Sequence, residues 1–466
     1  MRLHTTSGAR IAAAGIILAG FVLCLAVDLP GHLSYDSIVQ LLEGRTAQYG
    51  NWHPAVMSWL LGLADAAVPG TSLFVVFDAL LFFASLLGLL LIRPQPSRAV
   101  CAVAAVLILC PQVLIYQGIV WKDVLFADVA VAGFACLALG AERWEDAKVR
   151  FALVCGAFAL FALAALVRQN GAVVPLFGAV ALGWIAARRA PSRPFTRAVL
   201  IGGGALLAAG LLAASAAFAL ATRTVGDSGP SVQLQLLQTY DVIGAAAKQP
   251  DLDLARIAGD DSSLVKIIRT IGVRAWSPAR NDTLGNTTAL QEALDDADPD
   301  TMAAQWHDLI VHHPWLYLRV RAEVFGWVFF TPDLEQCLPY EVGVDGPAGV
   351  MAELGLKERN DIRDDALDKY AHLFVGTPVL SHAAYAVLAL ISLLILLRRG
   401  RAPDIAVAFL LLAALAFAAS FFVISIACDY RYLYFLDLAT MVAIFYLALD
   451  ARSVWDVLRE SLPFRR

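Results

Sequence analysis

The sequence predicts an all-α polytopic membrane protein with about ten transmembrane helices. Of its 466 residues, 59% are hydrophobic and only 16% are charged, whereas an ordinary soluble domain carries about 25% charged residues. The apolar residues come in blocks close to the length that a helix needs to cross about 30 Å of hydrocarbon. Composition and block length together place most of the chain in a lipid bilayer.

The predicted spans follow one another along the chain with one long interruption. The first follows Arg2 and Arg10, and no small-x-small cleavage site precedes Asp28. We therefore interpret it as a signal anchor rather than a cleaved signal peptide. The predicted spans are 11–27, 72–92, 99–117, 122–140, 151–167, 171–187, 198–221, 377–397, 405–427 and 433–449.

Positive charge sets the predicted orientation of these spans. With the N-terminus in the cytoplasm, the tails and short loops on that side hold 18 Lys or Arg, as the positive-inside rule expects. Both termini are then cytoplasmic. The richness in Ala, Leu and Gly suits a bacterium of high GC content, and we expect the protein in a bacterial inner membrane. The connections that face the extracytoplasmic side are 28–71, 118–121, 168–170, 222–376 and 428–432.

The apolar segment 53–68 decides this orientation. It is short for a span and contains Asp65. If it crossed the membrane, the Arg-rich loops that follow would face outward, against the charge rule. We therefore interpret it as a membrane-parallel or half-inserted helix.

The long interruption is predicted to be a separate extracytoplasmic segment. Region 222–372 holds 24 Asp or Glu against 13 Lys or Arg, and such an acidic surface argues against a nucleic-acid partner. Its patterns are mostly helical, for example from Ala303 to Val328. The three predicted parts are the N-terminal transmembrane module 1–221, the extracytoplasmic segment 222–376 and the C-terminal transmembrane module 377–466.

The seven cysteines show no paired short spacing, so the sequence indicates neither a metal-ligand cluster nor a disulfide framework. Cys337 and Cys428 are the two that fall on the predicted extracytoplasmic side, where a disulfide is chemically allowed. The sequence leaves open whether they pair.

The most informative stretch follows the first span, from Leu33 to Gly44. Ser34 can cap a short helix that Gly44 ends, which places Asp36 in the first turn and Gln40 one turn later on the same face. The Asp36 carboxylate then lies at a helix N-terminus near the membrane surface. Asp36 is either an acid that only stabilises the helix dipole or a site residue.

Four further motifs stand out, the first at the start of the half-inserted helix and the other three at the outward ends of spans. They are Trp52-His53-Pro54, Trp121-Lys122-Asp123, Arg168-Gln169-Asn170 and Asp429-Tyr430-Arg431-Tyr432. An acid in the first outward loop, then a short helix and a His-Pro motif, resembles the GT-C superfamily of integral-membrane glycosyltransferases. The order of the later motifs resembles it too, as does the long segment before the last spans.

The resemblance implies transfer of a sugar from a polyprenyl-phosphate donor to an envelope glycan, lipid or protein acceptor. Asp36 would be the base that deprotonates the acceptor hydroxyl, with Asp123 and His53 as further catalytic residues. The alternatives are that Asp123 pairs with a nearby cation and that His53 only forms hydrogen bonds at a helix start. Relatives with an Asp-Glu pair or an Asp-x-Asp in the first loop differ from this chain, so neither a metal nor another cofactor is indicated.

The departing phosphate needs cations, and three lie at the height of a lipid headgroup. Lys122, Arg168 and Arg431 are the expected phosphate ligands, although each could instead only snorkel toward the interface. The other predicted substrate-binding residues are Gln40, Trp52, Gln169, Asn170 and Tyr432.

Two other classes of protein compete with this interpretation. A transporter or lipid flippase would show internal repeats and polar residues at mid-membrane depth. We expect neither, because the ionisable residues gather at the outward ends of the spans. An acyltransferase would place a His and an Asp as a pair on spans, and the nearest candidate, His53, lacks an evident partner in the sequence.

Overall fold

The computed structural model describes residues 8–50, 52–189, 194–221, 223–224, 232–260 and 262–461. Residues 1–7 of the predicted cytoplasmic tail 1–10 and the last residues, 462–466, lie outside this part. Within it, helices are the only extended regular structure, and β-pairing is limited to isolated bridges. Nine described helices are long and apolar enough to cross a membrane, and a bent pair would make ten. The predicted all-α polytopic fold is confirmed.

Each predicted span overlaps one of these helices. The nine are α1 Gly8–Asp28, α4 Ser72–Leu90, α7 Lys122–Glu142, α8 Ala147–Val167, α9 Val173–Arg188 with the preceding turn η2 Gln169–Ala172, α10 Pro194–Ala221, α21 His382–Arg399, α22 Ala402–Ile424, and α23 Tyr434–Ala448 with the preceding turn η5 Tyr430–Leu433. The bent pair is α5 Ala99–Leu109 followed by α6 Pro111–Leu114 and the turn η1 Tyr116–Gly118. The 68° bend falls at Pro111, which disfavours a helical conformation in the residue before it.

The chain forms two compact units. Unit 1 comprises Met1–Val225, Tyr340–Phe417 and Tyr434–Arg466, and unit 2 comprises Gly226–Pro339 and Ala418–Leu433. The division by contacts therefore differs from the predicted segment 222–376, because its last part, from Tyr340 onward, belongs to unit 1.

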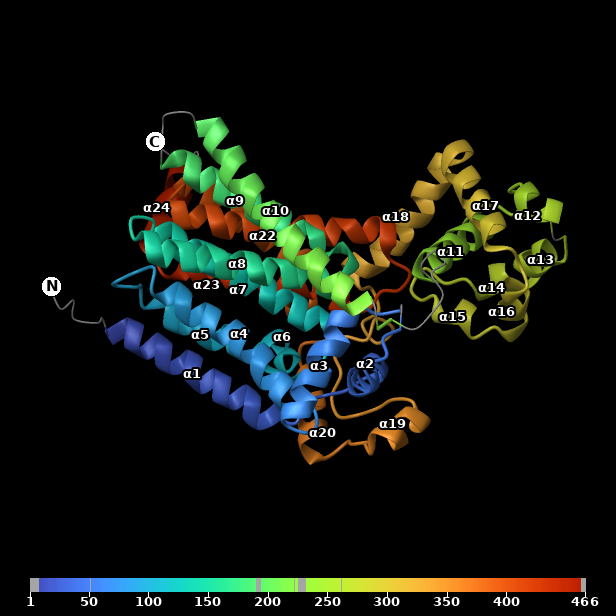
Figure 1. The fold of residues 1–466 in the computed structure, drawn as a ribbon, viewed down its shortest axis with the longest axis horizontal. Coiled ribbons are helices and arrows are strands. Elements are labelled where there is room, and N and C mark those ends of the chain that lie inside the picture. Colours follow the sequence, from blue (N-terminus) through green and yellow to red (C-terminus); the bar gives the residue numbers. More distant parts are fainter. Residues whose placement is uncertain are drawn as a thin grey trace. The chain divides into compact units, whose positions relative to one another are not determined.

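Unit 1 is a bundle in which α1, α4, α7 and α8 run side by side (Figure 1). Helix α7 lies at its centre, with 89% of its apolar window buried, whereas only 6% of that of α10 is buried. An apolar helix exposed to this extent needs lipid around it. The short C-terminal helix α24 Ala451–Ser461 follows α23.

The connection 28–71, predicted to face outward, folds into two short helices, α2 Tyr35–Thr46 and α3 Ala55–Ala67. The predicted end of α2 at Gly44 is wrong, since the helix continues to Thr46 and its C-cap Ala47 lies in the left-handed region with φ 52°. Gly44 instead faces Gly62 of α3 across a backbone contact that has no room for a side chain. The glycine is needed for this close approach rather than for a turn.

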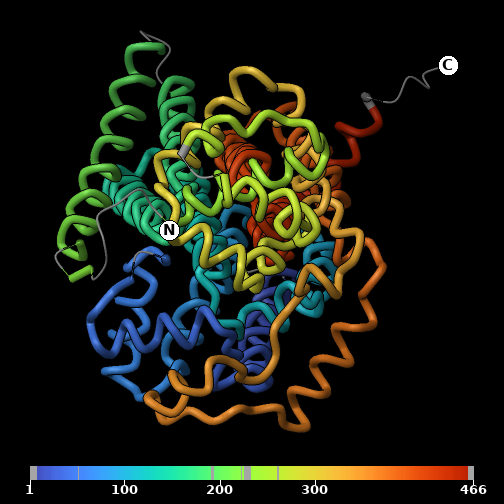
Figure 2. The backbone as a smooth tube through the Cα atoms, turned by 90° about the vertical axis from the view of Figure 1, so that its right-hand side faces the viewer, coloured from blue at the N-terminus to red at the C-terminus, as the bar shows by residue number. Residues whose placement is uncertain are grey.

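The segment after Tyr340 packs onto this first connection within unit 1. Leu33 N–H donates to the Gly343 carbonyl at 2.9 Å, and Val344 N–H donates to the Arg359 carbonyl at 2.9 Å. Figure 2 shows this orange segment beside the blue first connection. Its helices are α19 Ala348–Leu354, α20 Ile362–His372 and the turn η4 Pro378–Leu380.

Unit 2 is a cluster of mostly short helices around a core that includes Tyr240, Ile243 and Leu309. The helix predicted over Ala303 to Val328 is broken into α17 and α18 at Pro314, which has no N–H to continue the hydrogen-bond ladder. The elements are α11 Val232–Lys248, α12 Ala255–Asp260, α13 Ser262–Ile267, the π-turn η3 Ile268–Gly272, α14 Val273–Ala275, α15 Asp282–Gly285, α16 Thr288–Asp295, α17 Pro299–His312 and α18 Pro314–Phe330.

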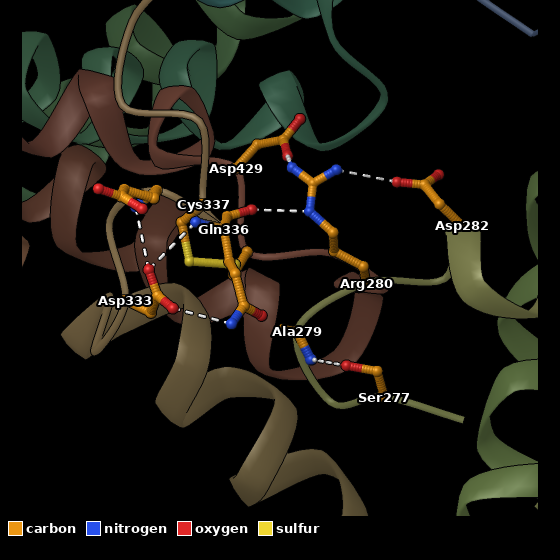
Figure 3. The surroundings of a disulfide bond; sticks show 10 residues. Ser277, Ala279, Arg280, Asp282, Asp333, Gln336, Cys337 and Asp429 are labelled. Atoms are coloured by element: carbon orange, nitrogen blue, oxygen red, sulfur yellow. Dashed lines mark hydrogen bonds and ion pairs between the residues drawn. A yellow bond between two sulfur atoms is a disulfide. The ribbon is translucent and has the colours of Figure 1, made fainter. Parts of the chain in front are cut away.

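A disulfide and an ion pair join the stretch 418–433 to the rest of unit 2. Cys337 and Cys428 form a disulfide, with Cα atoms 5.0 Å apart, so the pairing that the sequence left open is made. Next to it, Arg280 donates to the Gln336 carbonyl at 2.7 Å and pairs with Asp429 at 3.6 Å (Figure 3).

Candidate active site

The N-terminus of α2 is fixed by side chains, and this fixes the place of Asp36. Ser34 precedes the helix and forms a capping box with Ser37. Ser37 Oγ also donates to the Val120 carbonyl at 2.6 Å, and Trp121 Nε1 donates to Ser34 Oγ at 2.8 Å. These bonds hold the first turn of α2 against the loop that enters α7.

Three predicted site residues meet in front of this turn. His53 Nε2 lies 3.7 Å from Asp36 Oδ1, and Lys122 Nζ lies 3.0 Å from His53 Nδ1. Because an ammonium group can only donate, the contact with Lys122 assigns the acceptor role to Nδ1 and leaves the imidazole proton on Nε2. His53 therefore turns an N–H toward the Asp36 carboxylate, and its expected lack of a partner is wrong.

The exposure of Asp36 and His53 suits a reaction at Asp36. The Asp36 side chain is 22% exposed, whereas that of His53 is 3% exposed. The carboxylate can thus meet a hydroxyl group from outside, while the imidazole behind it is shielded from water. A partly exposed carboxylate with an imidazole N–H facing it at 3.7 Å is compatible with general-base catalysis.

Asp123 and Arg168 form a buried ion pair beside this group. Asp123 follows Lys122 in the first turn of α7, and Arg168 stands at the C-terminal end of α8. Arg168 also lies over the ring of Phe417, with its guanidinium carbon 5.6 Å from the ring centre. The alternative in which Asp123 pairs with a nearby cation is the arrangement found.

The remaining predicted residues of unit 1 lie around these groups. Trp52 is 44% exposed and packs edge-on to His53 at 6.4 Å. Gln40, one turn after Asp36, is buried, and among the described residues its Nε2 has no acceptor within hydrogen-bonding reach. Gln169 and Asn170 begin the turn η2 directly after Arg168.

Arg431 and Tyr432 belong to unit 2 and are described with it. Arg431 pairs with Asp429 at 3.1 Å, and its guanidinium carbon lies 5.9 Å from the Tyr432 ring centre. Tyr432 in turn stacks on Phe421. The predicted phosphate ligands thus divide between the two units, with Lys122 and Arg168 in unit 1 and Arg431 in unit 2.

A buried histidine stabilises the loop that leads to α2. His32 Nδ1 accepts from Gly343 N–H at 2.9 Å, and its Nε2 lies 3.2 Å from Asp28 Oδ1. Burial, followed by the positive charge of Arg359, lowers the pKa of His32 to about 4. His32 is thus a neutral structural residue that joins the first connection to the segment after Tyr340.

Sequence reasoning missed two polar pairs inside the spans of unit 1. Asp78 of α4 and Asp128 of α7 lie within hydrogen-bonding reach of each other, and His382 of α21 contacts Asp437 of α23 at 2.9 Å. The expectation that ionisable residues gather only at outward ends is therefore wrong. The sequence did carry a signal for the first pair. Asp78 and Asp128 are each the seventh residue of a predicted span, and a carboxyl group inside a span needs a partner or a function.

No group of three or more His, Cys, Asp or Glu side chains in the described ranges could hold a metal ion. The expectation of a reaction without a metal stays a prediction. The polar groups present can take up a proton at Asp36 and offer positive charge at Lys122 and Arg168.

Comparison of the chain with family models, with curated proteins and with solved structures finds no match.

Proposed function

We propose that this membrane protein is a glycosyltransferase that moves a sugar from a polyprenyl-phosphate donor to an acceptor hydroxyl of the cell envelope. The observation that supports this best is the contact series Asp36, His53 and Lys122 at the outward ends of α2, α3 and α7. It joins a partly exposed carboxylate to a buried imidazole and a cation, at the end of the bundle that the charge rule places outside.

In the proposed reaction, Asp36 takes the proton of the acceptor hydroxyl as the acceptor oxygen forms its bond to the anomeric carbon of the sugar. The bond from that carbon to the phosphate oxygen breaks, and polyprenyl phosphate leaves with the electron pair. His53 keeps the Asp36 carboxylate in place. Lys122 and Arg168 supply positive charge for the departing phosphate, and such charge-assisted contacts are stronger than neutral ones.

The proposed site faces the extracytoplasmic side of a bacterial inner membrane. Lys and Arg are concentrated in the short loops at the opposite end of the spans. The disulfide between Cys337 and Cys428 in unit 2 supports the same orientation, because disulfides persist in the periplasm and are rare in the cytosol.

A lipid-linked donor also needs a place for its hydrocarbon chain. A hollow of about 470 Å³ lies between α9 and α10, lined by apolar side chains such as Leu176, Trp184 and Phe195. Its lining is apolar, and on α10 it comes from the half next to the predicted cytoplasmic loop, so the hollow suits the far end of a hydrocarbon chain rather than the sugar phosphate.

The experiment that tests this function compares cells with and without the gene. Deletion should remove one sugar from an envelope glycan or lipid and leave its polyprenyl-phosphate sugar unused, as measured by mass spectrometry of both fractions. Plasmid-borne wild-type protein should restore the product. An unchanged glycan and lipid profile, in cells shown to produce the protein before deletion, would count against glycosyl transfer.

A transporter or lipid flippase for envelope precursors is the second candidate, and one observation favours it. Asp78 and Asp128 are buried inside spans, and intramembrane carboxyl groups often mark ion or substrate pathways. Purified protein in liposomes separates the two functions. A transporter moves a labelled polyprenyl-phosphate sugar between leaflets without an acceptor, whereas a glycosyltransferase consumes the donor only when an acceptor is present.

A further inference from the structure

A polar cluster lies inside the transmembrane bundle of unit 1, apart from Asp36. Asp78 and Asp128 are 1% and 0% exposed. Each stands six residues beyond the outward start of its helix, α4 or α7, which places it about 9 Å along the helix axis at 1.5 Å per residue. The two carboxyl groups lie within hydrogen-bonding reach of each other.

Two further side chains complete this cluster. Gln117 Nε2 donates to Asp128 Oδ1 at 3.2 Å and to Tyr434 Oη at 3.3 Å. Tyr434 donates its own hydrogen to the Gln112 carbonyl at 2.8 Å. The hydrogens of Gln117 and Tyr434 are therefore largely committed, and only one of them reaches a carboxyl oxygen.

Three buried oxygens in the cluster remain without a donor. They are Asp78 Oδ1, Asp128 Oδ2 and Gln117 Oε1, none of which has a hydrogen-bond partner among the described residues. Gln117 contacts Asp128 through Nε2 at 3.2 Å, so its amide group lies next to the carboxyl pair. Oxygen atoms without donors are the ligands that hard cations prefer.

The charge of the cluster requires a positive partner. Two adjacent carboxyl groups in a medium of low polarity cannot both stay ionised. In the described part of the chain, no Lys, Arg or His forms an ion pair with Asp78 or Asp128. One proton shared by the pair leaves a single negative charge, which a monovalent cation or a second proton neutralises.

We propose that Asp78, Asp128 and Gln117 form an intramembrane site for an exchangeable monovalent cation, either H⁺ or Na⁺. When Na⁺ enters, one carboxyl group releases its proton and becomes the carboxylate that holds the ion, so the charge stays balanced. Tyr434 of α23 faces the pair, with Tyr116 of η1 stacked on it at 4.5 Å. The inference is independent of glycosyl transfer, and such a site would make the protein respond to the ion gradient across the membrane.

Infrared spectroscopy of the full-length protein in detergent tests this site, because a protonated carboxyl group absorbs apart from a carboxylate. In choline chloride, the wild type should show a carboxylic C=O band that weakens when NaCl is added, with release of about one proton per protein. A band that persists in NaCl but disappears as the pH rises would restrict the site to the proton. Both results support an exchangeable cation.

Variants assign the band to the pair. The double variant Asp78→Asn with Asp128→Asn should lose both the Na⁺ response and the pH response of this band, because neither carboxyl group remains. Glu145→Gln changes an exposed carboxylate in unit 1 whose side chain is 89% exposed, and it should leave both responses unchanged. A wild-type band that neither Na⁺ nor pH alters while the protein stays folded would overturn the proposal, and this result does not depend on the folding of any variant.

Discussion

His53 directs Nε2 of its ring toward the Asp36 carboxylate, 3.7 Å from Oδ1, while Lys122 approaches Nδ1 on the other side. In the proposed reaction the ring orients the carboxylate and does not need to touch substrate. A residue in this role should affect the rate of the proton transfer more than the binding of the donor.

His53→Asn tests this role, because the Asn oxygen replaces Nδ1 as the acceptor for Lys122 but leaves no N–H facing Asp36. We expect kcat to fall by about tenfold or more, a loss of roughly 1.4 kcal/mol of transition-state stabilisation, with little change in the KM of the donor. His53→Gln, whose amide nitrogen reaches the place of Nε2, should recover part of the rate. Equal losses of kcat in both variants, with a raised KM, would assign His53 to substrate binding instead.

The buried pair Arg321 and Asp241 should carry much of the stability of unit 2. Arg321 is fully buried and donates to Asp241 at 2.8 Å and to the Ser425 carbonyl at 2.7 Å. Burial raises the pKa of Asp241, and Arg321 opposes this rise. Replacing Arg321 by Met leaves a buried carboxyl group unpaired, at a cost of about 3 to 5 kcal/mol.

Thermal unfolding of purified protein measures this cost, with Arg256→Met as the matched control. Arg256 pairs with Asp308 on the surface, where its side chain is 61% exposed, so its loss should cost about 1 kcal/mol or less. The double variant Arg321→Met with Asp241→Leu should recover part of the lost stability. Equal melting temperatures for the two Arg variants would show that the buried pair stabilises the protein no more than the surface pair does.

His32 predicts a dependence of stability on pH. Its folded pKa of about 4 lies below the ordinary histidine value of 6.5, so the unfolded chain binds a proton more readily than the folded protein. The contribution of neutral His32 is complete above about pH 6.5 and is lost as the pH falls toward about 4. The loss is on the order of 3 kcal/mol at most. The charged groups that face it are Asp28, Arg359, Asp361, Arg363 and Asp364.

Melting temperatures between about pH 7 and 4 should therefore fall less steeply for His32→Gln than for the wild type. His312→Gln serves as the control, because the side chain of His312 is 63% exposed. A wild-type profile parallel to that of His32→Gln would mean that the His32 ring does not titrate differently on folding.

Much of the fold could be predicted from the sequence, because the length and polarity of apolar blocks decide where helices cross a bilayer. The failures have local causes. Gly44 looked like a helix end but allows close packing against Gly62, and the apolar pattern across Pro314 hid a break between two helices.

The candidate site was less predictable, because it depends on packing between distant parts of the chain. Asp36, His53 and Lys122 could each be selected from its motif, but their contacts depend on how α2, α3 and α7 pack. Asp78 and Asp128 were visible as acids inside apolar blocks. Their pairing across two helices could not be read from a sequence without aligned relatives.

Single-cysteine labelling with a membrane-impermeant maleimide tests the orientation. Cysteines at Gln95 and Glu145 should react only after the cytoplasmic side is opened, and cysteines at Asp345 and Asp365 should react in intact cells. All four positions are exposed. Labelling of position 95 in intact cells would mean that segment 53–68 crosses the membrane, and the site at Asp36 would then lose its outward position.

The most direct measurement is the amount of glycan product in cells that carry only Asp36→Asn protein. Asn keeps the shape of Asp and still suits the first turn of α2, so the change should cost at most about 1 kcal/mol of stability. It cannot accept the proton, and loss of a general base lowers the rate by about a hundredfold or more. Glu353→Gln on α19 makes the same change at an exposed position and should leave the product intact. With both proteins at wild-type levels in the membrane, mass spectrometry should find the product lost in Asp36→Asn cells, whereas a normal amount of product there would contradict Asp36 as the base.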